Sequence, residues 1–563
     1  MRLTPFFVSG PSASARKIRR RGCGNSFLRQ FSALRKTIGD GRPWTMCHLR
    51  RRKNLPPSII HHPPSIFNHP PSVFPFYFLH LYQFNDNFVA MLKKLLVSLL
   101  SALLCISVVA EPESQSNENQ NETDVKIDEK GNVFVPPLKY HISDEGTAEV
   151  IFDRSYEDLE SVVIPSEIRI AGYVYPVTSI EYRAFYGCYD MTNIEIPSSV
   201  THIDISAFDY CIELTSINVS RYNTNYSSED GILYDKNKTT LVLVPKGKEG
   251  SIVLLSGVTC IGDNACSGCL MTSIEIPLSV TSIGKNAFWG CHGLTSIEIP
   301  SSVTSIGDNA FMWCRGLTNI NVSKDNLSYS SEDGVLYDKN KTNLICVPSD
   351  KKGIFEIPSS VTNIGVSAFY GCSGLTSIKI PKNVTIIGES AFMWCSGLTS
   401  IEIPFSVTSI GEDAFSECLG LTSIEIPSGV TSIGDWTFYD CQGLTSIKIP
   451  MGVTSIGCGA FEGSSLTNIN IPSSVTNIGN YAFMFCSGLT SIKIPKNVTI
   501  IGESAFMWCS GLTSIEIPFS VTSIGEDAFY GCGNLDIIID NSEKNVSVGK
   551  DAFEECKSVR FLK

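Results

Sequence analysis

Histidine is scarce in this sequence. Of its 8 histidines, only His141, His202 and His292 lie beyond residue 110, and they are far apart in the chain. A Ser-His-Asp or Cys-His catalytic arrangement would have to use one of these isolated side chains. The chain also has no Gly-rich phosphate-binding loop. We therefore expect no enzymatic activity and no bound cofactor.

Basic residues are also scarce over most of the chain. The first 110 residues hold 16 Lys and Arg against 2 Asp and Glu, which leaves 28 basic and 54 acidic residues from Glu111 onward, a net charge of −26. A protein with so many acidic side chains repels the phosphates of nucleic acids. We therefore expect no nucleic-acid partner.

Long apolar runs are limited to one segment, Leu95 to Val109, which follows Lys93 and Lys94 and precedes polar Glu111. Fifteen residues are too few to span a bilayer comfortably, and the pattern is that of a secretory signal. We predict that residues 91–110 are a signal peptide and that residues 1–90 are not part of the native protein. The alternative is a disordered extension ahead of a short anchoring helix. The mature chain has no predicted transmembrane segment.

Residues 111–130 are polar, acidic and free of aromatic side chains. Such a composition cannot bury enough apolar surface to offset the entropy lost on ordering. We predict a flexible acidic spacer over residues 111–134.

From about Val162 onward, one unit recurs with a period of 23 residues, and its best copies read C-S-G-L-T-S-I-E-I-P-S-S-V-T-S-I-G-x-x-A-F-x-x. Residues 372–415 and 486–529 are identical. A fixed period in the twenties predicts a solenoid, whose coils bury their apolar sides by stacking on one another. The Ala-Phe step recurs about fourteen times, so we expect a right-handed stack of about fourteen coils.

The residues of one coil, 398 to 415, indicate how it folds. Leu398, Ile401 and Ile403 fit a strand with one buried face, which Pro404 ends because it has no N–H for the ladder. Val and Ile then point inward from a turn, and Ala-Phe closes the far side. This arrangement predicts a parallel sheet on one face and irregular or short helical turns on the other.

The pattern resembles the BspA-like, Treponema-type leucine-rich repeats of bacterial and some protist surface proteins. The resemblance covers about residues 135–563 and rests on L-T-S-I-E-I-P (398–404), V-T-S-I-G (407–411) and A-F-x-x-C (414–418), repeated many times. It implies parallel strands on one face of a leucine-rich-repeat solenoid. It further implies that residues 135–187 form an atypical N-terminal cap and first coil ahead of the array, residues 188–563.

Two interruptions of the repeat share one design. Cys211 to Cys269 and Cys314 to Cys372 are both 58 residues apart, one coil plus 35 further residues. Each interruption contains S-S-E-D-G-x-L-Y-D-K-N-K-T followed by an apolar run. Alternating residues on either side of D-K-N-K predict a hairpin projecting from the coil, near residues 220–255 and 323–355.

Cysteine is abundant, with 20 residues, thirteen of them at the corner that ends a repeat. Coils about 4.8 Å apart lie within disulfide range, but equivalent side chains on adjacent coils point the same way. We expect a column of buried thiols that act as small apolar groups. Ser464 at one corner indicates that bonding is not required, and one Cys per coil is not a zinc-binding spacing. We expect no metal site.

The residue between the two strand isoleucines is predicted to point outward and to form a column along the sheet. It varies among Glu, Lys and Asn while the core positions hardly change. We predict that the charged members of this column contact a partner: Glu275, Glu298, Lys379, Glu402, Glu425, Lys448, Lys493 and Glu516. The alternative is a solubilising column with weak Glu–Lys pairs across coils. A second set, Trp289, Trp313, Trp394 and Trp508, is either exposed or half-buried between coils.

These features favour a secreted or cell-surface protein that binds other proteins. Family members are associated with adhesion to matrix proteins, so the resemblance implies binding to host or neighbouring-cell proteins, including matrix glycoproteins. The alternative is a structural or self-associating surface-layer protein in which the coils serve as spacers.

Overall fold

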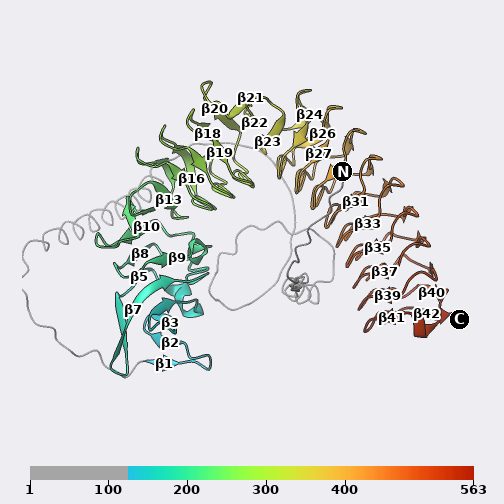
Figure 1. Cartoon of the computed structure of the whole chain (residues 1–563), viewed down its shortest axis with the longest axis horizontal. Coiled ribbons are helices and arrows are strands. Elements are labelled where there is room, and N and C mark those ends of the chain that lie inside the picture. The colour runs from blue at the N-terminus through green and yellow to red at the C-terminus, as the bar shows by residue number, and fades with distance from the viewer. Residues whose placement is uncertain (1–124, 563) are drawn as a thin grey trace, which may run out of the picture. The chain divides into compact units, whose positions relative to one another are not determined.

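The computed structural model describes residues 125–562, in which each repeat folds into one turn of a solenoid. Coils follow one another in chain order from β5 to β42 (Figure 1). In the coil formed by residues 398–415, Leu398, Val407 and Phe415 are fully buried and Ile401 nearly so, while Ile410 is partly buried. The predicted solenoid and its repeating core are confirmed. The segments predicted as a signal peptide and N-terminal extension lie outside the described residues.

The L-x-x-I-x-I segments form a first ladder of parallel strands. Equivalent residues of adjacent coils pair, for example Ile378 with Ile401 and Lys379 with Glu402. The strands of the first ladder are β5 (Ser161–Val163), β8 (Asn193–Ile196), β10 (Ser216–Val219), β14 (Gly250–Val253), β16 (Met271–Glu275), β18 (Ser296–Ile299), β20 (Asn319–Val322), β24 (Gly353–Glu356), β26 (Leu375–Lys379), β28 (Ser400–Glu402), β30 (Ser423–Glu425), β32 (Ser446–Lys448), β34 (Asn468–Ile469), β36 (Ser491–Ile492), β38 (Ser514–Ile517), β40 (Asp536–Ile539) and β42 (Ser558–Phe561).

The V-T-S-I segments form a second parallel ladder, where the sequence predicted only a turn. Its strands are mostly two residues long, because the following glycine turns the chain away. They are β9 (His202–Ile203), β13 (Thr240–Leu243), β15 (Cys260–Ile261), β17 (Ser282–Ile283), β19 (Ser305–Ile306), β23 (Asn343–Cys346), β25 (Asn363–Ile364), β27 (Ile386–Ile387), β29 (Ser409–Ile410), β31 (Ser432–Ile433), β33 (Ser455–Ile456), β35 (Asn477–Ile478), β37 (Ile500–Ile501), β39 (Ser523–Ile524) and β41 (Ser547–Val548).

The Ala-Phe segments form a third side made of turns. Two residues per coil have a positive φ, as at Asp413 (55°) and Glu417 (59°). Backbone N–H groups on this side donate to the next coil, including Phe415 N to Thr437 O at 2.9 Å. The third side therefore also joins coils by hydrogen bonds. Its helical content in the described residues is one short 3-10 helix, η3 (Ile205–Phe208).

The phenyl rings of the third side stack through the core. Between Phe369 and Phe553 every coil contributes a ring, and neighbouring ring centroids lie 5.1 to 6.0 Å apart with nearly parallel planes. Offset stacking at this spacing is favourable for aromatic pairs. The predicted phenylalanine column is therefore a continuous stack in this part of the array.

A mixed sheet, antiparallel except where β7 pairs with β4 and β9, precedes the first regular coil and covers the end of the core. Strand β7 joins it to the solenoid by pairing in parallel with β9. Tyr156 in η2 is fully buried, and its ring lies 5.6 Å from that of Phe185. The elements of this region are β1 (Lys126–Ile127), β2 (Val133–Val135), β3 (Leu138–Ile142), β4 (Ala148–Val150), η2 (Arg154–Asp158), β6 (Glu167–Ile170) and β7 (Tyr173–Ile180). Strand β1 begins within the segment predicted to be a spacer.

Each insertion contains an antiparallel hairpin, but the hairpin packs into the core instead of projecting from it. The hairpin strands are β11 (Tyr226–Glu229) with β12 (Ile232–Asp235), and β21 (Tyr329–Glu332) with β22 (Val335–Asp338). Leu233 packs against the preceding core cluster, while Ile232 and Tyr234 pack against the following one. The apolar residues between the S-S-E-D-G motif and D-K-N-K therefore lie between two parts of the core and contact both. A hairpin that projected from the coil would expose these side chains to solvent.

After each hairpin the insertion completes one more turn, with β13 and β14 in the first insertion and β23 and β24 in the second. These turns have Val244 and Val347 where other coils have Phe, so counting Ala-Phe steps missed them. The solenoid has about 17 turns, not about fourteen. Near the C-terminus, η4 (Glu543–Asn545) lies between β40 and β41. Among the described residues, no helix is both long and apolar enough to cross a membrane.

Candidate binding surface

The eight predicted contact residues all lie on the outward side of the first ladder, which we call the strand face. Each alternates with buried isoleucines, and each side chain is exposed. Their positions are Glu275 in β16, Glu298 in β18, Lys379 in β26, Glu402 in β28, Glu425 in β30, Lys448 in β32, Lys493 directly after β36 and Glu516 in β38. Within each of its sheets, such as β24-β26-β28 and β30-β32, the strands pair in parallel and in register, which aligns these residues as the repeat predicts. The ladder is divided between β16 and β18, between β28 and β30, between β32 and β34, and between β36 and β38.

Neighbouring members of the strand face interact across coils. Lys379 forms an ion pair with Glu356, and Lys448 forms one with Glu425. In both pairs the lysine side chain is more than half exposed. Exposed pairs of this kind contribute about 0 to 1 kcal/mol to stability, so they leave the charges available to a partner.

Two rows of threonines add hydrogen bonds between coils, one row along each ladder. In the first ladder, Thr399 Oγ1 donates to Thr376 O at 3.1 Å. In the second ladder, Thr499 Oγ1 donates to Thr476 O at 3.2 Å. The same bond recurs in most coils, one period apart. These exposed threonines therefore add a side-chain ladder to each backbone ladder.

The tryptophan set is half-buried for the most part. Trp289, Trp313 and Trp394 are partly exposed, and Trp508 is 41% exposed. The ring of Trp313 lies 5.8 Å from that of Trp289 and 6.1 Å from that of Trp394. These contacts cross coils, which favours the packing interpretation over an exposed anchor for these three.

The corner cysteines are buried, as predicted, except for Cys556 in the last coil, which is partly buried. Cys395 Sγ donates to Phe369 O of the preceding coil at 3.2 Å, and the same bond recurs at other corners. Burial raises the pKa of the Cys395 thiol well above its usual value. A protonated, hydrogen-bonded thiol is a weak nucleophile and a poor metal ligand. Within residues 125–562, no group of three His, Cys, Asp or Glu side chains is placed to hold a metal ion.

The family model described as "BspA type Leucine rich repeat region (6 copies)" matches residues 150–244, 248–354, 351–457 and 431–560. The chain belongs to this family. Its BspA-type repeats supply both ladders and the third side. A comparison with curated proteins gives no match.

Several solved structures of bacterial proteins are similar to this BspA-type array. A leucine-rich repeat protein from Eubacterium ventriosum is 23% identical, with a TM-score of 0.38, over 75% of this chain and 93% of that one. A leucine-rich cell surface protein from Faecalibacterium prausnitzii is 25% identical, with a TM-score of 0.31, over 74% and 97%. A leucine-rich repeat protein from Bacteroides ovatus is 27% identical, with a TM-score of 0.32, over 76% and 99%.

Sequence analysis missed one hollow in the BspA-type array, a pocket beside the second insertion. Its lining includes Asp308, Ser328 and Cys346. The sequence does contain a signal for this pocket, because the residues at the corresponding positions of the first insertion are different. Aligning the two insertions residue by residue, instead of noting only what they share, would have drawn attention to these positions.

Proposed function

We propose that this BspA-type protein is secreted or displayed at a cell surface, where it binds other proteins through its strand face. The observation that carries the proposal is the difference in variability between the core positions and the strand-face position of each coil. Core positions are nearly constant and mostly buried, whereas the strand-face position changes between acidic, basic and amide side chains and is exposed in nearly every coil. A rigid surface with independently variable positions is suited to recognition, and a few such residues supply most binding energy.

Adhesion to proteins of a host or of neighbouring cells, including matrix glycoproteins, is the form of binding that we favour. The strand face carries both signs of charge, so a partner with a mixed polar surface is complementary to it. Family resemblance supports this proposal. The predicted signal peptide supports export, which N-terminal sequencing of the exported protein tests. A mature N-terminus at Glu111 is expected, and one upstream of Met91 contradicts the signal.

The duplicated segment offers a matched test of the strand face. Lys379 and Lys493 are equivalent positions on it, whereas Lys382 and Lys496 are exposed, lie three residues later and lie outside its strands. We expect Lys379→Glu with Lys493→Glu to weaken binding to a positive member of a matrix-glycoprotein panel about tenfold. Lys382→Glu with Lys496→Glu makes the same charge change and should leave binding unchanged.

The competing function is a spacer that associates only with itself. The identical segments are compatible with that function, because a spacer gains length from each copy. Analytical ultracentrifugation separates the two. Concentration-dependent assembly, together with no binding to any glycoprotein of the panel, would replace the proposed function with the spacer.

A further inference from the structure

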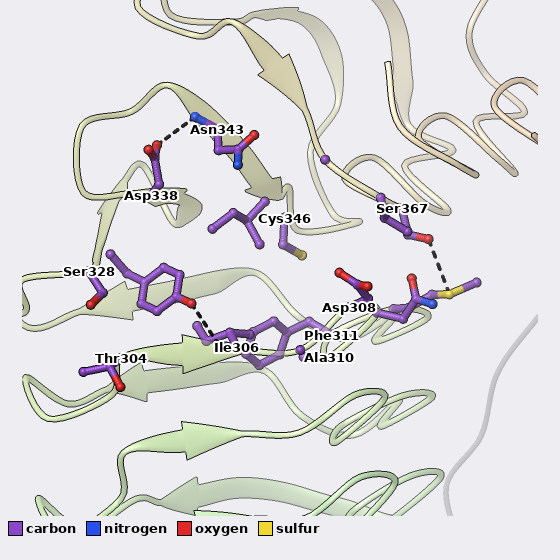
Figure 2. A pocket seen from close by; sticks show the side chains of 17 residues that line it. Thr304, Ile306, Asp308, Ala310, Phe311, Ser328, Asp338, Asn343, Cys346 and Ser367 are labelled. Atoms are coloured by element: carbon purple, nitrogen blue, oxygen red, sulfur yellow. Dashed lines mark hydrogen bonds between the residues drawn. The ribbon is translucent and has the colours of Figure 1, made fainter. Parts of the chain in front are cut away.

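The second insertion leaves a pocket of about 400 Å³ where the second ladder is interrupted (Figure 2). Strand β19 is the last strand of one sheet, and β23 belongs to the next. The pocket lies between the end of β19 and strands β22 and β23, with Asp308, Cys346 and Ser367 among its lining residues. This volume is within the range of small-molecule sites.

The interruption deprives a backbone carbonyl of its usual partner. In a regular coil, Ile283 O accepts from Gly307 N of the next coil at 2.8 Å. At the second insertion, β19 has no paired strand on its far side, and the next glycine donor, Gly365 N, lies one turn further on and bonds to Leu344 O at 2.8 Å. Ile306 O, the equivalent acceptor on the pocket wall, therefore receives no bond from the next coil.

One side chain, Asp308, adds a charged acceptor that is open to the pocket, and an amide oxygen is buried in the pocket wall. Asn309 Oδ1 is buried and has no hydrogen-bond partner. The Asp308 side chain is exposed, and within residues 125–562 its carboxylate makes no hydrogen bond or ion pair. Asp338, by contrast, is already used, because it accepts from Asn343 N at 2.7 Å. None of the 17 lining residues is Lys, Arg or His.

The first insertion, 103 residues earlier, carries different residues at three of these positions. Ile205 stands where the second insertion has Asp308, which removes the charge. Leu243 stands where it has Cys346 and is 1% exposed, so a larger side chain fills the space. Asn225 stands where it has Ser328, and Asn225 Nδ2 donates to Thr201 O at 3.1 Å. The carboxylate of Asp308 and the space beside Cys346 and Ser328 are thus specific to the second insertion, whereas the interrupted backbone ladder is common to both.

We propose that this pocket binds an alkylammonium group, from the lysine side chain of a partner protein or from a free diamine. An ammonium group supplies three donors and a positive charge, which match the free acceptors and the carboxylate. Its methylene chain packs against Ile306, Phe311 and Ile345, which also line the pocket. An anionic ligand is repelled by Asp308. The site lies outside the strand face and does not depend on the function proposed for it.

Calorimetric titration of the whole protein tests the proposal with three probes: Nα-acetyl-lysine N-methylamide, 1,4-diaminobutane, and the lysine compound with its side chain Nε-acetylated. We expect at least one amine to bind and the acetylated compound not to bind. Binding of the lysine compound alone identifies a side chain as the ligand, and binding of the diamine alone identifies a free diamine.

Two variants localise the site. Asp308→Asn removes the free charge at an exposed position and should weaken amine binding about tenfold. Asp325→Asn makes the same change at an exposed position of the same insertion outside the pocket and should leave affinity unchanged.

Ser328→Asn with Cys346→Leu copies the first insertion and should abolish binding. The proposal is overturned if neither amine binds, if the acetylated compound binds equally well, or if Asp308→Asn has no effect. Lys379→Glu with Lys493→Glu should bind amines normally, so failure of the strand-face proposal is recognised separately.

Discussion

Replacement of Phe415 by alanine should measure how much the phenyl stack stabilises the array. Phe415 is fully buried, and its ring centroid lies 5.1 Å from that of Phe392 and 5.5 Å from that of Phe438. The neighbouring rings belong to coils held by their own backbone bonds, so they cannot close the space left behind. Phe-to-Ala changes in such sites cost about 3 to 5 kcal/mol. Loss of two stacked contacts favours the upper half of that range.

The same coil supplies the control. Phe405 is 77% exposed, so Phe405→Ala should change the free energy of unfolding by less than about 0.5 kcal/mol. Urea unfolding of the whole protein compares the two variants. Hydrogen exchange should further place the loss of Phe415 in its own and adjacent coils, because a coil contacts only its neighbours. If both changes lowered the free energy of unfolding equally, the conclusion that the phenyl stack stabilises the array would be refuted.

Three further predictions concern the third side. Cys418 Sγ donates to Phe392 O at 3.2 Å, so Cys418→Val, which removes this donor, should destabilise the protein by about 1 to 2 kcal/mol, more than Cys418→Ser. Native corner thiols should react with a thiol reagent only as fast as the array opens, and rapid reaction would contradict their burial. Burial, helped by Asp440, raises the pKa of Glu417 from 4.5 to about 7. Between these pH values the folded state binds this proton more tightly than the unfolded state, so stability should fall as pH rises through the window. Glu417→Gln should flatten that dependence by about 1 kcal/mol, which is less than the full pKa shift corresponds to because solvent screens this half-exposed carboxyl. Urea unfolding at pH 5 and pH 8 measures the difference, and an unchanged pH dependence in Glu417→Gln would contradict it.

The repeat core was predictable because its signal is periodic. Leu398, Val407 and Phe415 recur every 23 residues, and stacking is the arrangement that buries all of them together. The strand face followed for the same reason, because side chains alternate along a strand. The second ladder was not predicted, because two residues such as Ser409 and Ile410 are too few to show an alternation.

The insertions were harder to predict because they do not repeat within themselves. Leu233 and Tyr234 are adjacent, and each packs against a different core cluster, so their positions depend on the coils on either side. The pocket is harder still. It arises from backbone groups such as Ile306 O, whose partner is missing only because the neighbouring strand is displaced.

Identical segments of this array do not present identical surfaces. Lys379 and Lys493 occupy the same position in the two copies, residues 372–415 and 486–529. Lys379 follows Glu356 on the strand face and pairs with it, whereas Lys493 follows Asn470 and makes no ion pair within residues 125–562. Since strand-face contacts cross between coils, the binding proposed for this face would have two adjacent coils as its smallest unit. Duplication of a segment therefore creates a new surface at each junction while it preserves the core.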